Sequence, residues 1–426
     1  MHSSSFNSAP ASPAKLTKLL PMVVIAVIMT SVPACSKFHK SATVNQPTPL
    51  ARLPASHHVL TQVFNQQGLG SQSAKSNRHF SLGNANIFSR KQKVALQQSP
   101  NQFQVASDAN GYVTANANGV ITATNLNGKR VWQASLKQGL ASGVAIDTAG
   151  STVVVSDAFG GLIAFDRQTG KQRWQSHLNS SVLSPALITN DRVISLTNSG
   201  VISANSLQTG ELIWQFATQN PALSVRGGSS PILLNATSAL VATADGRVHA
   251  INLDDGTPLW STRMGIAQGG SDIERLADID ATPVLNNNML YVTSYSGQLT
   301  AVDLTTRQLV FVKDKDYASI KKVGVDDSQI YVTTLDGKVA ALDKQTGNVN
   351  WENNDLRFRG LSNALATNNV VLVGDALGYL HVLDKATGKL IDRAQLRSDI
   401  AQLQVSPQGI IATSQNGGFS VWQVNR

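Results

Sequence analysis

The chain has 426 residues, a formal net charge of +9 and a single cysteine. One cysteine excludes an intramolecular disulfide and a metal site built from several cysteines. Charged residues make up only 14% of the chain and 32 residues are glycine, a composition typical of a protein rich in β-sheet.

The first 34 residues have the pattern of a secretory signal peptide. Lys15 and Lys18 form its basic region, and Leu19–Met29 forms its apolar core. The apolar run is too short to span a membrane comfortably. We therefore expect residues 1–34 to be removed on export.

The cleavage region Val32-Pro33-Ala34-Cys35 resembles a bacterial lipobox. The resemblance implies that Cys35 is diacylated and becomes the first residue of the mature protein, and two or three acyl chains would hold the protein firmly on a bilayer. Ser36, in place of Asp, resembles the pattern that permits sorting to the outer membrane. A plain secretory signal with an incidental cysteine is the alternative.

Residues 35–58 are predicted to be the lipidated cysteine followed by a flexible tether. The segment is polar and contains proline, without hydrophobic periodicity, and its r.m.s. span would be ~25 Å. Removing Lys15 and Lys18 with the signal leaves a net charge of 9 − 2 = +7. Export and the lack of a basic stripe with interleaved aromatics argue against nucleic acid as a partner.

A repeated phrase occupies the remainder of the chain and predicts its architecture. Each copy has a glycine, four or five mostly apolar residues, a polar residue, a turn glycine and then tryptophan. Successive copies start 42, 39, 46, 51, 40, 41 and 39 residues apart, and the last is truncated. A period near forty with strand–turn–strand content is typical of a radial array of β-sheets. The copies open at Gly119, Gly161, Gly200, Gly246, Gly297, Gly337, Gly378 and Gly417.

Each part of the phrase has a structural interpretation. The apolar runs predict strands covered on both faces, as in stacked propeller blades. Alanines in these runs suit the crowded inner end of a blade, and the following glycine suits a tight turn. Five tryptophans occupy one position of the phrase, which predicts packing between blades. Phe311 and Asp392 stand in that position in the fifth and seventh copies; the tryptophans are Trp132, Trp174, Trp214, Trp260 and Trp351.

The predicted fold is therefore all-β, an eight-bladed β-propeller of four-stranded antiparallel blades over residues 59–426, with seven blades as the alternative. Val59–Phe64 is the expected closing strand from the N-terminal side, because sharing the last blade between both ends of the chain leaves no open ring.

No motif of known catalytic chemistry appears, and we predict no catalytic residue, no metal ligand and no cofactor. Recurring aspartates, such as Asp166, Asp303, Asp343 and Asp384, are expected to accept backbone hydrogen bonds in turns. The phrase resembles the quinoprotein-type repeat of pyrroloquinoline-quinone dehydrogenases. Those enzymes typically have a vicinal cysteine pair that this chain lacks, so a periplasmic dehydrogenase is kept as an alternative function, beside a ligand-sensing propeller.

Two insertions lengthen the spacing after the third and fourth copies. The first contains Leu223, Val225 and Arg226, and the second contains Asp278 and Asp280. Both mix apolar and charged residues, which is typical of a recognition surface. The alternative is that they only cap blades, with Arg226 paired to one of the two aspartates.

The insertions, and the stretch Val373–His381, resemble the BamB family of outer-membrane assembly lipoproteins from Val59 onward. The resemblance implies a non-enzymatic scaffold in the β-barrel assembly machinery, lipid-anchored on the periplasmic face of the outer membrane. Its expected partners are the periplasmic domains of the insertase BamA, other lipoproteins of the machinery and unfolded outer-membrane proteins. Carried over by motif, the residues that bind BamA are Leu223, Val225, Arg226, Asp278 and Asp280.

Overall fold

The computed structural model describes residues 45–53, 59–66, 103–219, 228–265, 279–313 and 316–425. The signal peptide and Cys35 lie outside these ranges. The chain divides into two units, and the second, Asn45–Arg426, contains every described residue. In the described ranges, no helix is long and apolar enough to cross a membrane.

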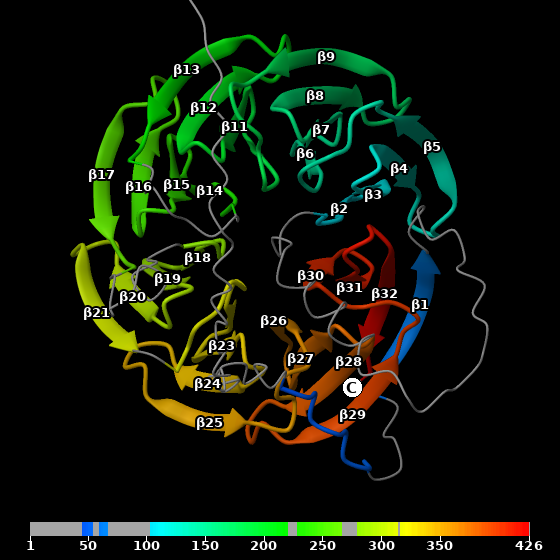
Figure 1. Ribbon diagram of the computed structural model, residues 1–426, viewed down its shortest axis with the longest axis vertical. Helices are drawn as coiled ribbons and strands as arrows, with labels where there is room; N and C mark the ends of the chain where they lie inside the picture. Colours follow the sequence, from blue (N-terminus) through cyan, green and yellow to red (C-terminus); the bar gives the residue numbers. More distant parts are fainter. Residues whose placement is uncertain are drawn as a thin grey trace, which may run out of the picture. The chain divides into compact units, whose positions relative to one another are not determined.

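Eight sheets of four antiparallel strands are arranged around a ring, as predicted, and form an eight-bladed β-propeller (Figure 1). The first strand of each blade lies nearest the centre and the fourth lies at the rim. Blades 1 to 4 comprise β2 (Ala106–Asp108), β3 (Gly111–Ala115), β4 (Val120–Thr124), β5 (Arg130–Ser135); β6 (Ala145–Ile146), β7 (Thr152–Ser156), β8 (Gly161–Asp166), β9 (Gln172–His177); β10 (Leu187–Ile188), β11 (Arg192–Leu196), β12 (Val201–Ser206), β13 (Leu212–Ala217); and β14 (Ile232–Asn235), β15 (Ser238–Ala242), β16 (Arg247–Asn252), β17 (Pro258–Arg263).

The other four blades follow in chain order, and the last one joins both ends of the propeller. Blades 5 to 7 comprise β18 (Val284–Asn286), β19 (Met289–Thr293), β20 (Leu299–Asp303), β21 (Gln308–Lys313); β22 (Gly324–Val325), β23 (Gln329–Thr333), β24 (Val339–Asp343), β25 (Val349–Asn353); and β26 (Leu361–Ala366), β27 (Val370–Asp375), β28 (Tyr379–Asp384), β29 (Leu390–Gln395). Blade 8 comprises β30 (Gln402–Ser406), β31 (Gly409–Thr413), β32 (Phe419–Val424) and, at its rim, β1 (Leu60–Gln66).

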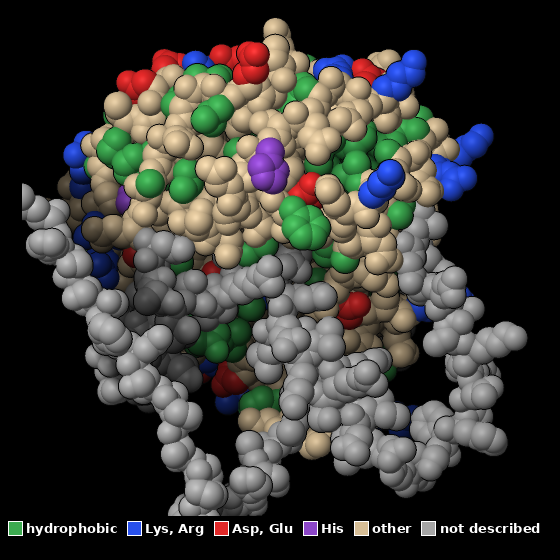
Figure 2. Space-filling view, turned by 45° about the horizontal axis from the view of Figure 1, so that its top comes forward, with side chains coloured by type: hydrophobic (Ala, Val, Ile, Leu, Met, Phe, Trp, Pro, Cys, Tyr) green, Lys and Arg blue, Asp and Glu red, His purple; other side chains and the backbone are tan. Residues whose placement is uncertain are grey.

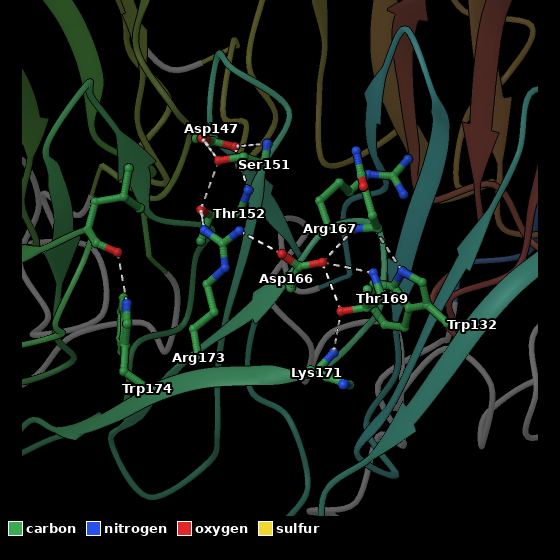
Figure 3. A network of polar contacts seen from close by, with 12 residues as sticks. Trp132, Asp147, Ser151, Thr152, Asp166, Arg167, Thr169, Lys171, Arg173 and Trp174 are labelled. Atoms are coloured by element: carbon green, nitrogen blue, oxygen red, sulfur yellow. Dashed lines mark hydrogen bonds and ion pairs between the residues drawn. The ribbon is translucent and has the colours of Figure 1, made fainter.

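The repeated tryptophan joins each blade to the next one. Trp214, in β13 of blade 3, is buried, and its indole N–H donates to the carbonyl oxygen of Leu253 in blade 4 at 2.8 Å. The ring lies against the turn glycine of that blade, Gly256, where an added Cβ would come within 2.5 Å of it. Trp132, Trp174 and Trp351 make the same bond to Arg167, Leu207 and Lys385 of the following blades (the first two are drawn in Figure 3). The predicted packing between blades is confirmed.

Variants of the phrase keep this contact or replace it. Phe311 packs against Gly347 as a tryptophan would. Arg307 stands in the turn-glycine position of blade 5 at φ 57°, and Trp260, which belongs to the preceding blade, is only half-buried. Asp392 instead accepts a hydrogen bond from Val59 N at 2.9 Å. This bond fixes the chain immediately before the closing strand β1.

The alanines of the repeated runs do not line the inner end of a blade, contrary to the expectation. They lie in the third strand, opposite the aromatic residue of the fourth, as Ala204 does opposite Trp214. A methyl group at this place leaves room for the indole on the same face of the sheet. The other pairs are Ala123–Trp132, Ala164–Trp174, Ala250–Trp260, Ala301–Phe311 and Ala341–Trp351.

The recurring aspartates cap turns, as predicted. Asp166 Oδ1 accepts hydrogen bonds from Gln168 N and Thr169 N, and Asp343 does the same in blade 6 (Figure 3 shows the first turn). The hydrogen bond from Arg173, followed by those from Thr169, lowers the pKa of Asp166. These carboxylates are therefore structural acceptors.

The ring closes through β1, which pairs with β32 as the predicted closing strand does. Phe64 of β1 packs 3.0 Å from the place of a Cβ on Gly128 in blade 1, so it takes the position that tryptophan holds elsewhere. Its ring also contacts Tyr112 and Phe419 edge-on, with centroids 5.4 and 5.6 Å away. Phe64, which lies in the N-terminal strand of blade 8, thus joins this blade to blade 1.

Part of the predicted tether is bound to the propeller. Residues 45–53 lie on blades 6 and 7, where Thr48 N donates to Arg357 O at 3.0 Å and Leu50 packs on their shared apolar core. Arg359 donates to Thr48 O at 3.0 Å, and Arg393 donates to Ala51 O. A flexible tether does not account for this part of the chain, because its peptide groups have specific partners.

A buried polar network lies under this docked segment. Asp375 Oδ2 accepts hydrogen bonds from Arg359 Nε at 2.7 Å and His381 Nε2 at 2.9 Å. Burial alone would raise the pKa of Asp375, but the hydrogen bonds from His381 and Tyr379 N outweigh it and lower the pKa. Burial is the main cause that lowers the pKa of His381, so the imidazole is neutral and donates its Nε2 proton to Asp375.

We expect the aromatic–glycine contact to be a main source of stability. Gly256→Ala places a methyl group against Trp214 at a residue with φ 74°, and should lower the free energy of unfolding by about 2–4 kcal/mol. In a Trp214→Ala background only the backbone strain remains, so the added loss should fall to about 1–2 kcal/mol. Urea denaturation of the four proteins measures this coupling.

Gly150→Ala is the matched control, because Gly150 has φ 64° and no aromatic neighbour. Its loss should be the smaller, strain-only value. Equal losses for Gly256→Ala with and without Trp214 would show that the contact has no role in stability.

Protein stability should fall as the pH drops below about 6.5. His249 and His381 are buried with lowered pKa values, so the unfolded chain binds more protons than the folded chain between the folded pKa and about 6.5. His381→Gln should reduce the fall in melting temperature between pH 7 and 5, while His177→Gln, at an exposed residue, should not. A fall of the same size in His381→Gln and the parent would contradict this origin.

Candidate functional site

The two sequence insertions connect blades on one side of the ring. The first joins β13 to β14 and the second joins β17 to β18. Residues 220–227 and 266–278 lie outside the described ranges, so the structure does not place Leu223, Val225, Arg226 or Asp278. The described ends of both insertions, which include Asp280, show where the two segments return to the propeller.

These two ends are joined directly. Ser230 N donates to Thr282 Oγ1 at 3.2 Å. Each of these residues is followed by a proline, and the strands β14 and β18 begin directly after the two prolines. Ser184 Oγ donates to Ser229 O at 3.1 Å and ties blade 3 to the same place. The dipeptides Ser230-Pro231 and Thr282-Pro283 are the sequence signal that accompanies this arrangement.

A small pocket lies where the insertions return. Gly228, the first described residue after one insertion, and Asp280, close after the other, both line it. The walls are completed by the turns between the second and third strands of blades 3 and 4. The other lining residues are Leu183, Leu196, Thr197, Asn198, Gly200, Ser229, Ala242, Thr243, Ala244 and Ile279.

Asp280 is enclosed by the protein, with 4% of its surface exposed. Its carboxyl group faces surroundings made by the chain itself, so a direct contact with another protein requires this pocket to open. The role predicted for Asp280 in binding a partner stays a prediction. Asp280 nonetheless lines the same pocket as Gly228, the first described residue after the first insertion.

The pocket also defines the face of the ring to which the insertions belong. It contains Asn198 and Ala244, from turns between second and third strands. In an antiparallel blade these turns and the connections to the next blade lie at the same strand ends, while the glycine turns beside tryptophan lie at the opposite ends. We call the side of the ring that carries the turns between second and third strands and the connections between blades the loop face. The docked segment reaches the loop face as well, at Arg357 and Arg359 between β25 and β26.

Among the described residues, no group of three or more His, Cys, Asp or Glu side chains could hold a metal ion. In the face drawn in Figure 2, acidic and basic side chains both lie along the upper edge. The buried pair of Asp375 and His381 is covered completely, which fits a structural role.

Comparisons with known proteins agree with this architecture. A family model described as outer membrane protein assembly factor BamB matches residues 117–353. The chain is 27% identical to the BamB of Escherichia coli K12 over 92% of this chain and 94% of that protein. It is 29% identical to the BamB of Yersinia pestis, over 67% and 74% of the two chains.

Solved structures give the same result. The crystal structure of BamB from Moraxella catarrhalis is 39% identical, covers 75% of this chain and 96% of its own, and has a TM-score of 0.72. A quinohemoprotein alcohol dehydrogenase from Pseudomonas putida, 13% identical with a TM-score of 0.56, shares the fold alone. Since the family model covers more than half of the chain and the blades agree with it, the chain belongs to the BamB family of outer-membrane protein assembly factors.

Proposed function

We propose that the protein is a non-enzymatic scaffold of the β-barrel assembly machinery that assists folding and insertion of outer-membrane proteins. Membership in the BamB family supports a role in the assembly of outer-membrane proteins. The observation that carries the site is the hydrogen bond of Ser230 N to Thr282 Oγ1, since it brings the bases of both insertions together.

The proposed binding surface is formed by the two insertions on the loop face. Leu223 and Val225 would supply an apolar anchor, and the guanidinium of Arg226 would supply several donors to a partner. Asp278 lies two residues before the buried Asp280 in the sequence, and its carboxylate would be a second charged contact. We propose the periplasmic domains of the insertase BamA as the partner of this surface.

The proposed location is the periplasmic face of the outer membrane, through a lipid on Cys35. The docked segment supports an N-terminal anchor, because its contacts with Arg357 and Arg359 fix the chain at residue 48. From Cys35 to Asn45 the chain can span at most about 35 Å. The propeller would therefore stay close to the membrane surface that carries the anchor.

A pull-down from solubilised membranes tests the function and the site together. The tagged full-length protein should recover the barrel insertase. The Arg226→Ala/Asp278→Ala variant should recover at least about tenfold less insertase, because truncating a charged residue in an interface removes a large share of the binding energy. Circular dichroism and lipid labelling would show that the variant is folded and acylated.

Arg130→Ala/Asp327→Ala is the matched control, because both residues are exposed and lie on other blades. It should recover as much insertase as the parent protein. Recovery by the insertion variant at the parent level would move the interface elsewhere, and no recovery by the parent would overturn the proposed function.

A further inference from the structure

The turn between β7 and β8 of blade 2 carries a phenylalanine where most blades carry a polar residue. In every blade this turn contains a glycine with positive φ. Six blades have Asn, Ser or Asp directly before that glycine, as is usual in turns because these side chains bond to the backbone. Blade 7 has Leu377 there, and blade 2 has Phe159, with 67% of its surface exposed. The six polar residues are Asn118, Ser199, Asp245, Ser296, Asp336 and Asn416.

The backbone around Phe159 is fixed. The buried Asp157 accepts hydrogen bonds at its Oδ1 from Phe159 N at 2.8 Å and from Gly161 N at 2.7 Å. Ala158 N donates to Gly139 O at 2.9 Å, which ties the turn to the connection that enters blade 2. The aromatic ring is thus exposed on an ordered turn of the loop face, and a partner that binds it pays little entropy for ordering this backbone.

The same turn is connected to the end of the first insertion. Gly160 O, directly after Phe159, accepts a hydrogen bond from Leu178 N at 2.8 Å. Leu178 begins the connection from blade 2 to blade 3, and Ser184 of this connection donates to Ser229 O at 3.1 Å. Residues 178 and 184 can be at most about 21 Å apart. Phe159 and the first insertion therefore lie on neighbouring parts of the loop face, over adjacent blades (Figure 1).

We propose that Phe159 is a further apolar anchor of the partner-binding surface, which extends from the insertions over blade 2. This inference rests on the proposed function. The occupant is an apolar recess on the BamA domain that the first insertion binds, beside the recess that takes Leu223 and Val225. Exposed aromatic residues are enriched in protein interfaces and supply much of their binding energy. The first insertion of the same chain is the alternative cover for the ring.

Binding of the purified periplasmic domains of BamA to the mature protein, measured by calorimetry, tests the proposal. Phe159→Ser should weaken binding at least about tenfold, because it removes the anchor. Its melting temperature should equal that of the parent, since the ring is exposed and blade 3 has a serine, Ser199, at this position of the turn. Phe159→Leu retains an apolar side chain and should keep most of the affinity.

Leu377→Ser is the matched control, because it removes an exposed apolar residue from the same turn position of blade 7. That blade lies across the ring from blade 3 (Figure 1), so this variant should bind as the parent does.

The outcomes separate this inference from the function on which it rests. Equal affinity in Phe159→Ser and the parent, with weaker binding by Arg226→Ala, would overturn the inference and leave the proposed function in place. A lowered melting temperature in Phe159→Ser would assign the ring to packing within the chain and would also overturn the inference. No binding by the parent would overturn the proposed function, and the role of Phe159 with it.

Discussion

The propeller depends on one contact repeated around the ring: an aromatic side chain at the rim of one blade packs on the turn glycine of the next. The glycine is needed because the turn requires a positive φ and because a Cβ would collide with the ring, as at Gly256 beneath Trp214. The indole N–H also reaches a backbone acceptor of the neighbouring blade, Leu253 O. Packing and hydrogen bonding therefore both fix the position of each blade relative to the next.

The closure of the ring requires a substitute for this contact at both ends of the repeat. Phe64 supplies an aromatic ring to blade 1, and Asp392 holds Val59 as the chain enters β1. Because β1 completes a blade whose other strands lie more than 330 residues later, closing the ring joins both ends of the sequence. The docked segment before β1 extends this connection over blade 7.

The sequence predicted the architecture well because each blade repeats the same local chemistry. The glycine spacing predicted eight blades, the tryptophan position predicted the contact between them, and the run at Val59–Phe64 predicted the closing strand. The repeat could not show that Phe64 replaces tryptophan, since this residue lies outside any copy of the phrase. It also misplaced the alanines, because a small residue fits the inner end of a blade as well as the space beside an indole.

The candidate site was less accessible to sequence reasoning. The insertions stood out by their length, but the contact between their described ends joins Ser230 and Thr282, which are 52 residues apart and precede different blades. The docking of Thr48 on Arg357 likewise joins residues 309 positions apart. Both contacts follow from the closed ring, which brings connections of neighbouring blades to one face.

The central functional claim is that the loop face of blades 3 and 4 carries the partner. Photo-crosslinking in cells tests it, with the crosslinker placed at Ser199 or Ala244 on that face and at Gln208 or Asp255 at the opposite ends of the same blades. We expect adducts with the barrel insertase from Ser199 and Ala244 alone. Adducts mainly from Gln208 and Asp255 would contradict it.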